Sequence, residues 1–416
     1  MRQPSAVLEI VYFDAGGGHR SAMNALKEVL EERYPTWCIK PVNLQKLLEP
    51  ADPVHQITEK LSRPLHKYLV PLAPRLSFRP FQTQDIYNVA LKRGVTFGLG
   101  AILPILQTYI ELNAPKIEGI LKRYWCRPDA EAPDLVVSVI PNFNGVMFRA
   151  LKAVHPNTPF VTVMTDMVDC PPHFWMEDQD QVVVCGTQRA LEQAKTSGFY
   201  RAQNIYEVSG MILRKSFYKD AAKWQLTREH LGLRPSLPTA IIMFGGNGSL
   251  SVSLSILEQF EAAKLKLQTI VMCGNNKKLY DSLQGRAGCH AVGFVANVAD
   301  YMRLADFLIG KPGPGSVSEA IHVGCPVIVE CNKSTMPQER PNVDWILEMQ
   351  VGLAVKSFEK DIVGAVQTML ASLASFKANI DRNVPKNFAV FEIATILNQI
   401  IQRRQHRVRR LAARVY

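Results

Sequence analysis

The sequence predicts an α/β protein made of two Rossmann-like domains that face one cleft. Three observations support this. Apolar strand patterns at residues 7–13 and 239–244 each run into a glycine loop and then into a helical pattern. Short apolar strands alternate with amphipathic helices after each of these openings. A further strand, glycine loop and helix follow one another over residues 307–323, in the second half of the chain.

Composition places the chain among soluble enzymes. Its 416 residues are enough for two to three domains, and 47% are hydrophobic and 20% charged. The eight cysteines include no Cys-x-x-Cys pair, and single thiols in apolar runs are typical of a reducing compartment. No apolar run reaches the length of a membrane span, and we expect neither a transmembrane helix nor a signal peptide.

The net charge of +11 is concentrated in two segments. Residues 60–93 hold seven Lys or Arg against one acid, and residues 401–416 hold six Arg and no acid. The first segment runs into the uncharged stretch 94–106, which favours an anionic membrane surface. Nucleic-acid binders instead spread basic residues over a recognition element or an aromatic groove. We expect a peripheral protein at the cytoplasmic face of a membrane, although solvated faces would give the same charge count.

The first glycine loop, residues 14–20, reads DAGGGHR and follows the first strand. Its glycines, Gly17 and Gly18 among them, let the backbone approach a ligand. His19 is expected beyond the carboxyl end of the strand, where open α/β sheets bind ligands, and can serve there as a general base near neutral pH. The alternative is a tight turn whose imidazole only caps the helix.

Four parts of the chain follow from this alternation. We expect an N-terminal domain over residues 1–205, a connection over 206–236, a C-terminal domain over 237–385, and a helix with a basic tail over 386–416. An insertion at about residues 45–125 interrupts the first domain and lies either in a membrane interface or against its own domain. We also expect a helix over residues 221–231 in the connection.

The second half carries the features of a nucleotide site. A helix N-terminus offers unpaired N–H groups and a partial positive charge, so the loop at 311–316 suits a diphosphate. We expect Ser316 as the N-cap of that helix and Glu319 as a carboxylate that accepts hydrogen bonds from a ribose. A strand–loop–helix junction without a ligand is the alternative. In the first half of the chain, Asp166 follows an apolar strand, as His19 does, and we expect both residues at the carboxyl ends of strands in one sheet.

These motifs, in this order, resemble the monogalactosyldiacylglycerol synthase family, which includes bacterial diacylglycerol glucosyltransferases. The resemblance rests on DAGGGHR at 14–20, GFV at 293–295, KPGPG at 311–315 with Glu319 and Ala320, and QE at 338–339 with Asn342. It implies a GT-B fold and an inverting transfer from a UDP-sugar to a lipid hydroxyl. The N-terminal domain would hold the lipid and the C-terminal domain the nucleotide.

The resemblance also implies roles for individual residues. His19 matches the proposed general base. Asp166 is the next candidate from the residues alone, because it ends a strand of the same sheet. The implied nucleotide-sugar ligands are Gly245, Gly246, Asn247, Phe294, Val295, Gly313, Pro314, Gly315, Ser316, Glu319, Gln338 and Glu339. Phe294 falls at the uracil-binding turn, and Gln338 and Glu339 fall where the donor sugar's hydroxyls are held. The implied acceptor-binding residues are Gly17, Gly18, His173, Phe174 and Trp175.

Two departures from the family pattern concern the phosphates and the acceptor. Asn247 stands where the family commonly has an acid. Pro171 and Met176 stand where plant members carry histidines, and Phe174-Trp175 reverses the family's pair. These departures bear on the acceptor more than on the type of reaction.

The predicted function is transfer of a hexose from UDP-galactose or UDP-glucose to diacylglycerol or a similar lipid. No tightly bound cofactor or metal is expected, because no cluster of His, Cys and acids has ligand spacing. An isoprenoid-linked acceptor is the alternative within the same class, and a sugar-nucleotide epimerase fits the basic and apolar insertion less well. A non-catalytic sugar-nucleotide or lipid-binding module is the alternative from another class. Nucleic-acid binding would rest on charge alone.

Overall fold

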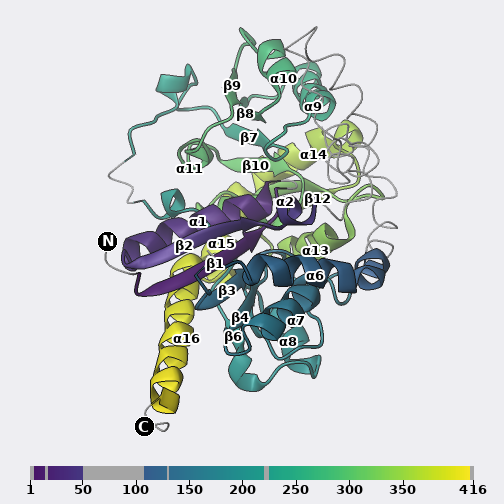
Figure 1. The fold of residues 1–416 in the computed structure, drawn as a ribbon. Coiled ribbons are helices and arrows are strands. Elements are labelled where there is room, and N and C mark those ends of the chain that lie inside the picture. The colour runs from purple at the N-terminus through teal and green to yellow at the C-terminus, as the bar shows by residue number, and fades with distance from the viewer. Residues whose placement is uncertain (1–3, 15–16, 50–106, 129–130, 220–223, 413–416) are drawn as a thin grey trace, which may run out of the picture.

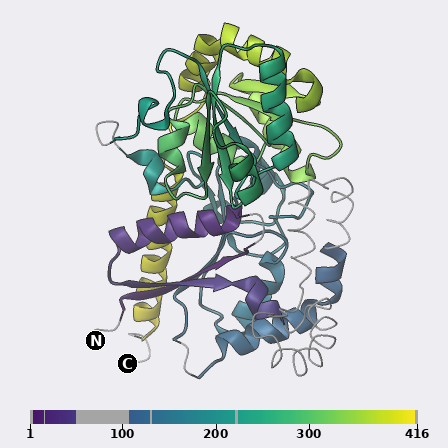
Figure 2. The same ribbon diagram turned by 90° about the horizontal axis from the view of Figure 1, so that it is seen from above.

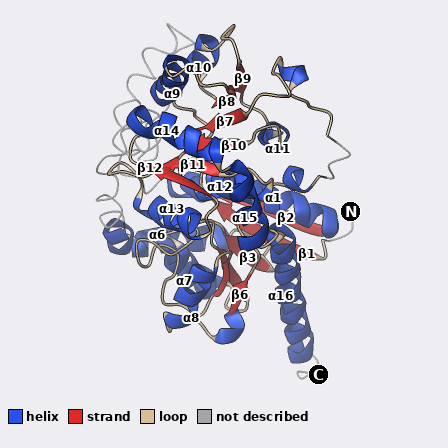
Figure 3. Cartoon of the chain, turned by 180° about the vertical axis from the view of Figure 1, so that it is seen from behind, coloured by secondary structure: helices blue, strands red, loops and turns tan. Residues whose placement is uncertain are grey.

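The computed structural model describes residues 4–14, 17–49, 107–128, 131–219 and 224–412. Most of the predicted insertion at 45–125, and all of the basic segment at 60–93, lie outside the described residues. The described chain forms two lobes, each with a parallel six-stranded sheet and helices on both of its faces (Figure 1, Figure 3). This is the arrangement that the sequence predicts.

The N-terminal sheet has the strand order β2-β1-β3-β4-β5-β6, and every pair is parallel. Its strands are β1 (Ala6–Tyr12), β2 (Trp37–Asn43), β3 (Leu135–Ser138), β4 (Phe160–Val163), β5 (Val182–Cys185) and β6 (Ile205–Glu207). Strand β2 was not predicted. It lies at the edge of the sheet, is only partly buried and contains Pro41, so it lacks the continuous apolar run of the central strands.

The C-terminal sheet has the order β12-β11-β10-β7-β8-β9 and is also parallel throughout. Its strands are β7 (Thr239–Met243), β8 (Gln268–Gly274), β9 (Cys289–Gly293), β10 (Phe307–Gly310), β11 (Val327–Glu330) and β12 (Gly352–Val355). Strand β12, a four-residue edge strand, was not predicted. Gly352 opens β12 because a Cβ there would lie 2.2 Å from the carbonyl oxygen of Val327.

Helices cover both sheets. In the N-terminal lobe these are α1 (Gly18–Arg33), α2 (Leu44–Leu48), α6 (Ala114–Trp125), α7 (Asn144–Val154) and α8 (Gln188–Thr196). In the C-terminal lobe they are α9 (Leu250–Ala262), α10 (Lys277–Ser282), α11 (Val298–Met302), α12 (Pro314–His322), α13 (Arg340–Glu348), α14 (Phe358–Ala371) and α15 (Leu373–Asn383). Helix α1 lies on the side of its sheet that faces the other lobe (Figure 2). Short 3-10 turns lie at Ala202–Asn204, Lys215–Tyr218, Glu229–Leu231 and Pro337–Glu339.

The predicted helix at 221–231 is wrong over the described residues 224–231. Only the 3-10 turn Glu229–Leu231 forms there. The connection is instead held by Arg228, whose guanidinium donates to the carbonyls of Leu304, Pro235 and Leu237 and pairs with Asp306 at 2.9 Å. A side chain that binds backbone carbonyls fixes an extended segment without helical hydrogen bonds.

The C-terminal helix α16 (Ala389–Ala412) returns to the N-terminal lobe and packs along α1 and β1 (Figure 1). Its apolar face, from Ala389 to Ile401, joins the core beside the buried side chains of α1. Arg404 pairs with Asp134, and Arg33 on α1 donates to the Phe391 carbonyl at 2.9 Å. The helix continues to Ala412, so it includes most of the segment that the sequence analysis describes as a basic tail. None of the described helices is long and apolar enough to cross a membrane.

Candidate active site

A cleft of about 1810 Å³ lies between the two lobes, at the carboxyl edges of both sheets. In doubly wound α/β proteins this edge is where ligands bind, because the loops and helix N-termini that follow the strands converge there. The predicted site residues that line it are Gly17, Gly18, His19, Asp166, Gly245, Gly246, Asn247, Phe294, Val295, Gly313, Pro314, Gly315, Ser316, Glu319 and Glu339. Gln338, His173, Phe174 and Trp175 are not among its lining residues.

His19 is the second residue of α1, which begins after Gly17 in the left-handed conformation with a φ of 85°. Its Nδ1 atom lies 2.8 Å from the carbonyl oxygen of Val139, at the end of the neighbouring strand β3. A carbonyl oxygen only accepts hydrogen bonds, so the contact assigns the ring proton to Nδ1 and leaves Nε2 as the basic nitrogen. Burial lowers the pKa of His19 to about 4 and keeps the ring neutral at physiological pH.

Asp166 follows β4 and is buried beside the cleft. Its Oδ2 atom accepts a hydrogen bond of 2.9 Å from the indole N–H of Trp175. Burial raises the pKa of Asp166 to about 7, against the opposing effect of the Trp175 hydrogen bond. Because Trp175 is fully buried and its ring centre lies 6.2 Å from that of His19, the indole supports both side chains from behind.

The side chains of Phe174 and Trp175, which the resemblance implies as acceptor-binding residues, lie in the core of the N-terminal lobe, and their contact with an acceptor stays a prediction. Asp169 turns their loop inward by accepting the backbone N–H groups of His173 and Trp175 at 3.0 and 2.6 Å. His173 is left exposed, with a φ of 64° and its ring against Phe199. The aromatic segment therefore holds the cleft wall in place and does not form its surface.

The loop after β7 contacts the carboxyl end of β8 through its backbone. Gly274 has a φ of 56°, and a Cβ added to it would lie 2.2 Å from the carbonyl oxygen of Gly246. Gly248 has a φ of 57°, and its Cβ would lie 2.6 Å from the carbonyl oxygen of Cys273. Glycine is required at both positions, for conformation and for space. The loop after β7 and the end of β8 therefore form one compact wall of the cleft, which is lined there by backbone.

Helix α12 begins at Pro314, three residues earlier than an N-cap at Ser316 predicts. Gly313 is its N-cap residue, no side chain caps it, and Ser316 lies inside the first turn. Proline is favoured at this first helical position because its φ is already helical and its missing N–H would have had no partner within the helix. The N–H groups of Gly315 and Ser316 remain at the open end of the helix, beside the cleft. This end can bind an anion.

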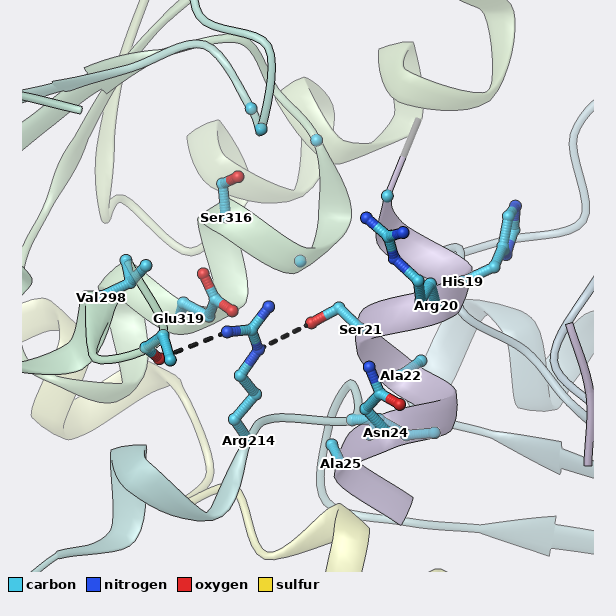
Figure 4. Close-up of a pocket in the computed structure, with 18 of the residues that line it drawn as sticks. His19, Arg20, Ser21, Ala22, Asn24, Ala25, Arg214, Val298, Ser316 and Glu319 are labelled. Atoms are coloured by element: carbon cyan, nitrogen blue, oxygen red, sulfur yellow. Dashed lines mark hydrogen bonds between the residues drawn. The ribbon is translucent and has the colours of Figure 1, made fainter. Parts of the chain in front are cut away.

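Glu319, one turn further along α12, is half-buried at the wall of the cleft. Burial raises its pKa to about 7, although the nearby positive charge of Arg214 works in the opposite direction. Arg214 comes from the connection between the lobes. Its Nε donates to the Ser21 hydroxyl at 3.0 Å and its Nη1 to the Ala296 carbonyl at 3.3 Å, so it joins both lobes beside Glu319 (Figure 4).

Sequence reasoning missed Arg214 and did not assign a role to Lys311. Arg214 stands in a connection without a recognisable motif, and its one signal was a basic pair after the apolar run at 211–213. Lys311 begins the loop at 311–316, and the sequence does not show that Glu339 is its partner. Its Nζ atom lies 3.1 Å from Oε1 of Glu339, across the cleft-lining loops.

Gln338, which precedes Glu339 in the 3-10 turn Pro337–Glu339, has a buried Oε1 atom with no hydrogen-bond partner among the described residues. The groups that do face the cleft offer hydrogen-bond donors, carboxylates and one imidazole. Within the described ranges, no group of three or more His, Cys, Asp or Glu side chains could hold a metal ion. The site can therefore bind an anion on one lobe and accept a proton on the other.

Comparison with known proteins identifies relatives for this arrangement. Residues 240–354 match the glycosyltransferase family 28 C-terminal domain. The monogalactosyldiacylglycerol synthase of Spinacia oleracea is 28% identical over 286 residues, which cover 65% of this chain and 54% of that protein. The chain thus spans about half the length of this relative. The match confirms the predicted resemblance to this family.

Solved structures confirm the GT-B fold. The calicheamicin glycosyltransferase CalG4 superposes with a TM-score of 0.57 at 13% identity, over 97% of this chain and 99% of that chain. UGT89C1 of Arabidopsis thaliana, complexed with UDP, superposes with a TM-score of 0.56 at 13% identity, over 94% of this chain and 99% of that chain. At such identities the likeness concerns the fold alone.

Proposed function

We propose that this chain, which carries a glycosyltransferase family 28 C-terminal domain and is similar to the monogalactosyldiacylglycerol synthases over most of its length, is a UDP-sugar-dependent hexosyltransferase. Its donor is UDP-galactose or UDP-glucose. Its acceptor is the hydroxyl group of a lipid, and 1,2-diacylglycerol is the first candidate. The activity for which the relatives are named and the arrangement of the cleft together support this assignment.

The observation that carries the proposal is the orientation of His19. Its Nδ1–H group is held by the Val139 carbonyl, so Nε2 is free to accept a proton. This nitrogen belongs to a residue that lines the cleft opposite the anion-binding end of α12. A neutral base on one lobe and an anion site on the other are what transfer from a nucleotide sugar to a hydroxyl requires.

In the proposed reaction, the acceptor oxygen bonds to the anomeric carbon while the bond from that carbon to the diphosphate oxygen breaks, with inversion. His19 takes the hydroxyl proton at Nε2, and UDP departs with the electron pair of the broken bond. The free N–H groups of α12 and the loops around Gly246 and Gly313 stabilise the departing charge, because they are fixed before reaction. Phe294 would contact the uracil, and Glu319 would accept from the ribose hydroxyls.

A lipid acceptor requires access to a membrane. The end of α16 carries exposed Arg407 and Arg410 on the N-terminal lobe, which is the proposed acceptor lobe. Basic side chains at such a position favour an anionic lipid surface by about 1 kcal/mol each. We therefore propose peripheral attachment, to which the segment at 60–93 would add its net charge of +6.

The test is a donor-by-acceptor screen of the purified full chain with mass identification of the lipid product. UDP-galactose, UDP-glucose and UDP-N-acetylglucosamine are each offered with diacylglycerol and with an isoprenoid-linked sugar, in mixed micelles. A glycosyl-diacylglycerol that is absent with His19→Gln supports the proposal. Transfer to the isoprenoid substrate alone would replace the acceptor. UDP binding without transfer to any acceptor would make the chain a binding module.

A further inference from the structure

We propose that Lys311 binds the β-phosphate of the donor and of the UDP product, and that Glu339 holds this cation while the site is empty. The proposal rests on the proposed function, since it assigns the charge partner of the leaving group. It also predicts that the two residues have opposite effects on UDP affinity.

The position of Lys311 places its charge at the meeting point of two glycine loops. It directly follows β10 (Phe307–Gly310) and precedes the N-cap of α12. A Cβ built on Gly245 would lie 3.8 Å from Cε of Lys311, and one built on Gly313 would lie 3.7 Å from the same atom. The stem of Lys311 therefore runs between the loop after β7 and the loop before α12, both of which line the cleft.

Lys311 differs from the other cations of the cleft. The described lining residues include four more, of which Arg20 lies on α1 and Arg214, Lys215 and Lys219 lie on the connection. Among the described cleft residues, only Lys311 brings a full positive charge on a loop of the C-terminal sheet, beside the free N–H groups of α12. A terminal phosphate bound there would meet both.

Glu339 is the counter-charge in the empty protein. Its Oε1 lies 3.1 Å from the ammonium of Lys311, and its side chain is only 12% exposed. The pair is fixed to one framework, because Asn342 on α13 donates to the Pro312 carbonyl at 2.7 Å and so ties the Glu339 segment to the Lys311 loop. Glu339 and Lys311 are therefore preset at contact distance.

Binding of ligand must change this pair. A diphosphate that takes Lys311 leaves Glu339 as a mostly buried carboxylate without its cation, which is unfavourable. A UDP-sugar relieves the penalty, because sugar hydroxyls can donate to Glu339. UDP alone has no such donors. The pair thus weakens the binding of UDP relative to UDP-sugar, which favours release of the product.

The experiment is calorimetric titration of the full chain with UDP and with UMP, at one pH and one salt concentration. Lys311→Ala should weaken UDP binding by about 10- to 100-fold, the usual effect of a lost charge-assisted hydrogen bond, and change UMP binding by less than about threefold. Glu339→Gln should strengthen UDP binding by about threefold or more, because it removes the carboxylate that competes with the β-phosphate for the Lys311 ammonium. Lys277→Ala is the matched control, since Lys277 is an exposed lysine paired with Asp281 outside the cleft.

The possible outcomes distinguish a failure of the proposed function from a failure of the roles assigned to Lys311 and Glu339. Absence of UDP binding by the parent chain would refute the proposed function. Parental UDP affinity in Lys311→Ala would overturn the assignment of Lys311, whatever the donor. Weaker UDP binding in Glu339→Gln would overturn the holding role of Glu339. If thermal unfolding shows that Lys311→Ala is not folded, Lys311→Met is used in its place, because its side chain still fills the space between the two loops.

Discussion

Replacing His19 tests the proposed chemistry most directly. The change His19→Ala removes Nε2 and also the hydrogen bond of 2.8 Å to Val139. A lost general base lowers kcat by about 10²- to 10⁴-fold, or about 3–5 kcal/mol of barrier. UDP affinity should stay within about twofold, because the proposed ribose and diphosphate contacts of UDP lie on the other lobe. His19→Gln separates the two losses, since its amide can still donate to the carbonyl but cannot take the proton.

The pH dependence of kcat also tests whether His19 is the general base, and it needs no substitution. Burial lowers the pKa of His19 to about 4, so the basic form persists well below the ordinary histidine value. At saturating donor, kcat should stay level from pH 8 down to about 5 and fall only as the pH approaches 4. The assay is initial rates of lipid glycosylation across buffers of constant ionic strength.

If Asp166 were the general base, the pH dependence of kcat would differ. Its pKa is raised to about 7 by burial, so a base at Asp166 would make kcat fall as the pH drops through 7. Near-normal turnover of His19→Ala, together with a fall near pH 7 that Asp166→Asn abolishes, would refute the His19 assignment. Loss of activity in His19→Gln with an unchanged UDP titration supports it.

Three further predictions concern the donor, the membrane and the fold. Glu319→Gln should weaken UDP binding by about 1.5–3 kcal/mol at pH 8, and UDP affinity of the parent should fall as Glu319 takes up a proton below pH 7, as measured by calorimetry. Arg407→Ser with Arg410→Ser should reduce co-sedimentation with anionic vesicles, most clearly at low salt, because screening weakens the attraction. Glu9→Gln should lower the free energy of unfolding in urea by about 1–3 kcal/mol, since buried Glu9 accepts from Trp125 at 2.9 Å and Tyr124 at 3.1 Å.

Each of these has a control. A Glu319→Gln titration that keeps the parental affinity, or the parental pH dependence, would remove Glu319 as the ribose ligand. Lys277→Ser with Lys278→Ser removes the same charge from α10 and should leave vesicle binding unchanged; equal binding to neutral and anionic vesicles would contradict the role of the α16 arginines. Tyr124→Phe removes one of the two donors to Glu9 and should cost less than Glu9→Gln.

The sequence by itself determined the fold class and most of the cleft. Strands β1, β7 and β10 are continuous apolar runs that end in glycine loops, and both features are local in the chain. Parallel strands place their carboxyl ends at one edge of a sheet, so the loops that carry His19 and Gly245 had to converge at the edges of their sheets. The comparisons confirm the GT-B fold and the resemblance that these motifs predicted.

Tertiary structure decided what local pattern does not contain. An aromatic pair such as Phe174-Trp175 has the same pattern in a cleft wall or in a core, and only the inward turn at Asp169 put Trp175 behind Asp166. The short edge strands β2 and β12 lack a distinctive apolar run, so pairing with a neighbour reveals them. Arg214 bonds to Ser21 across 193 positions of sequence, and a contact between such distant polar groups leaves no periodicity to detect. The sequence thus determined which loops meet, while packing decided which side chains face the cleft.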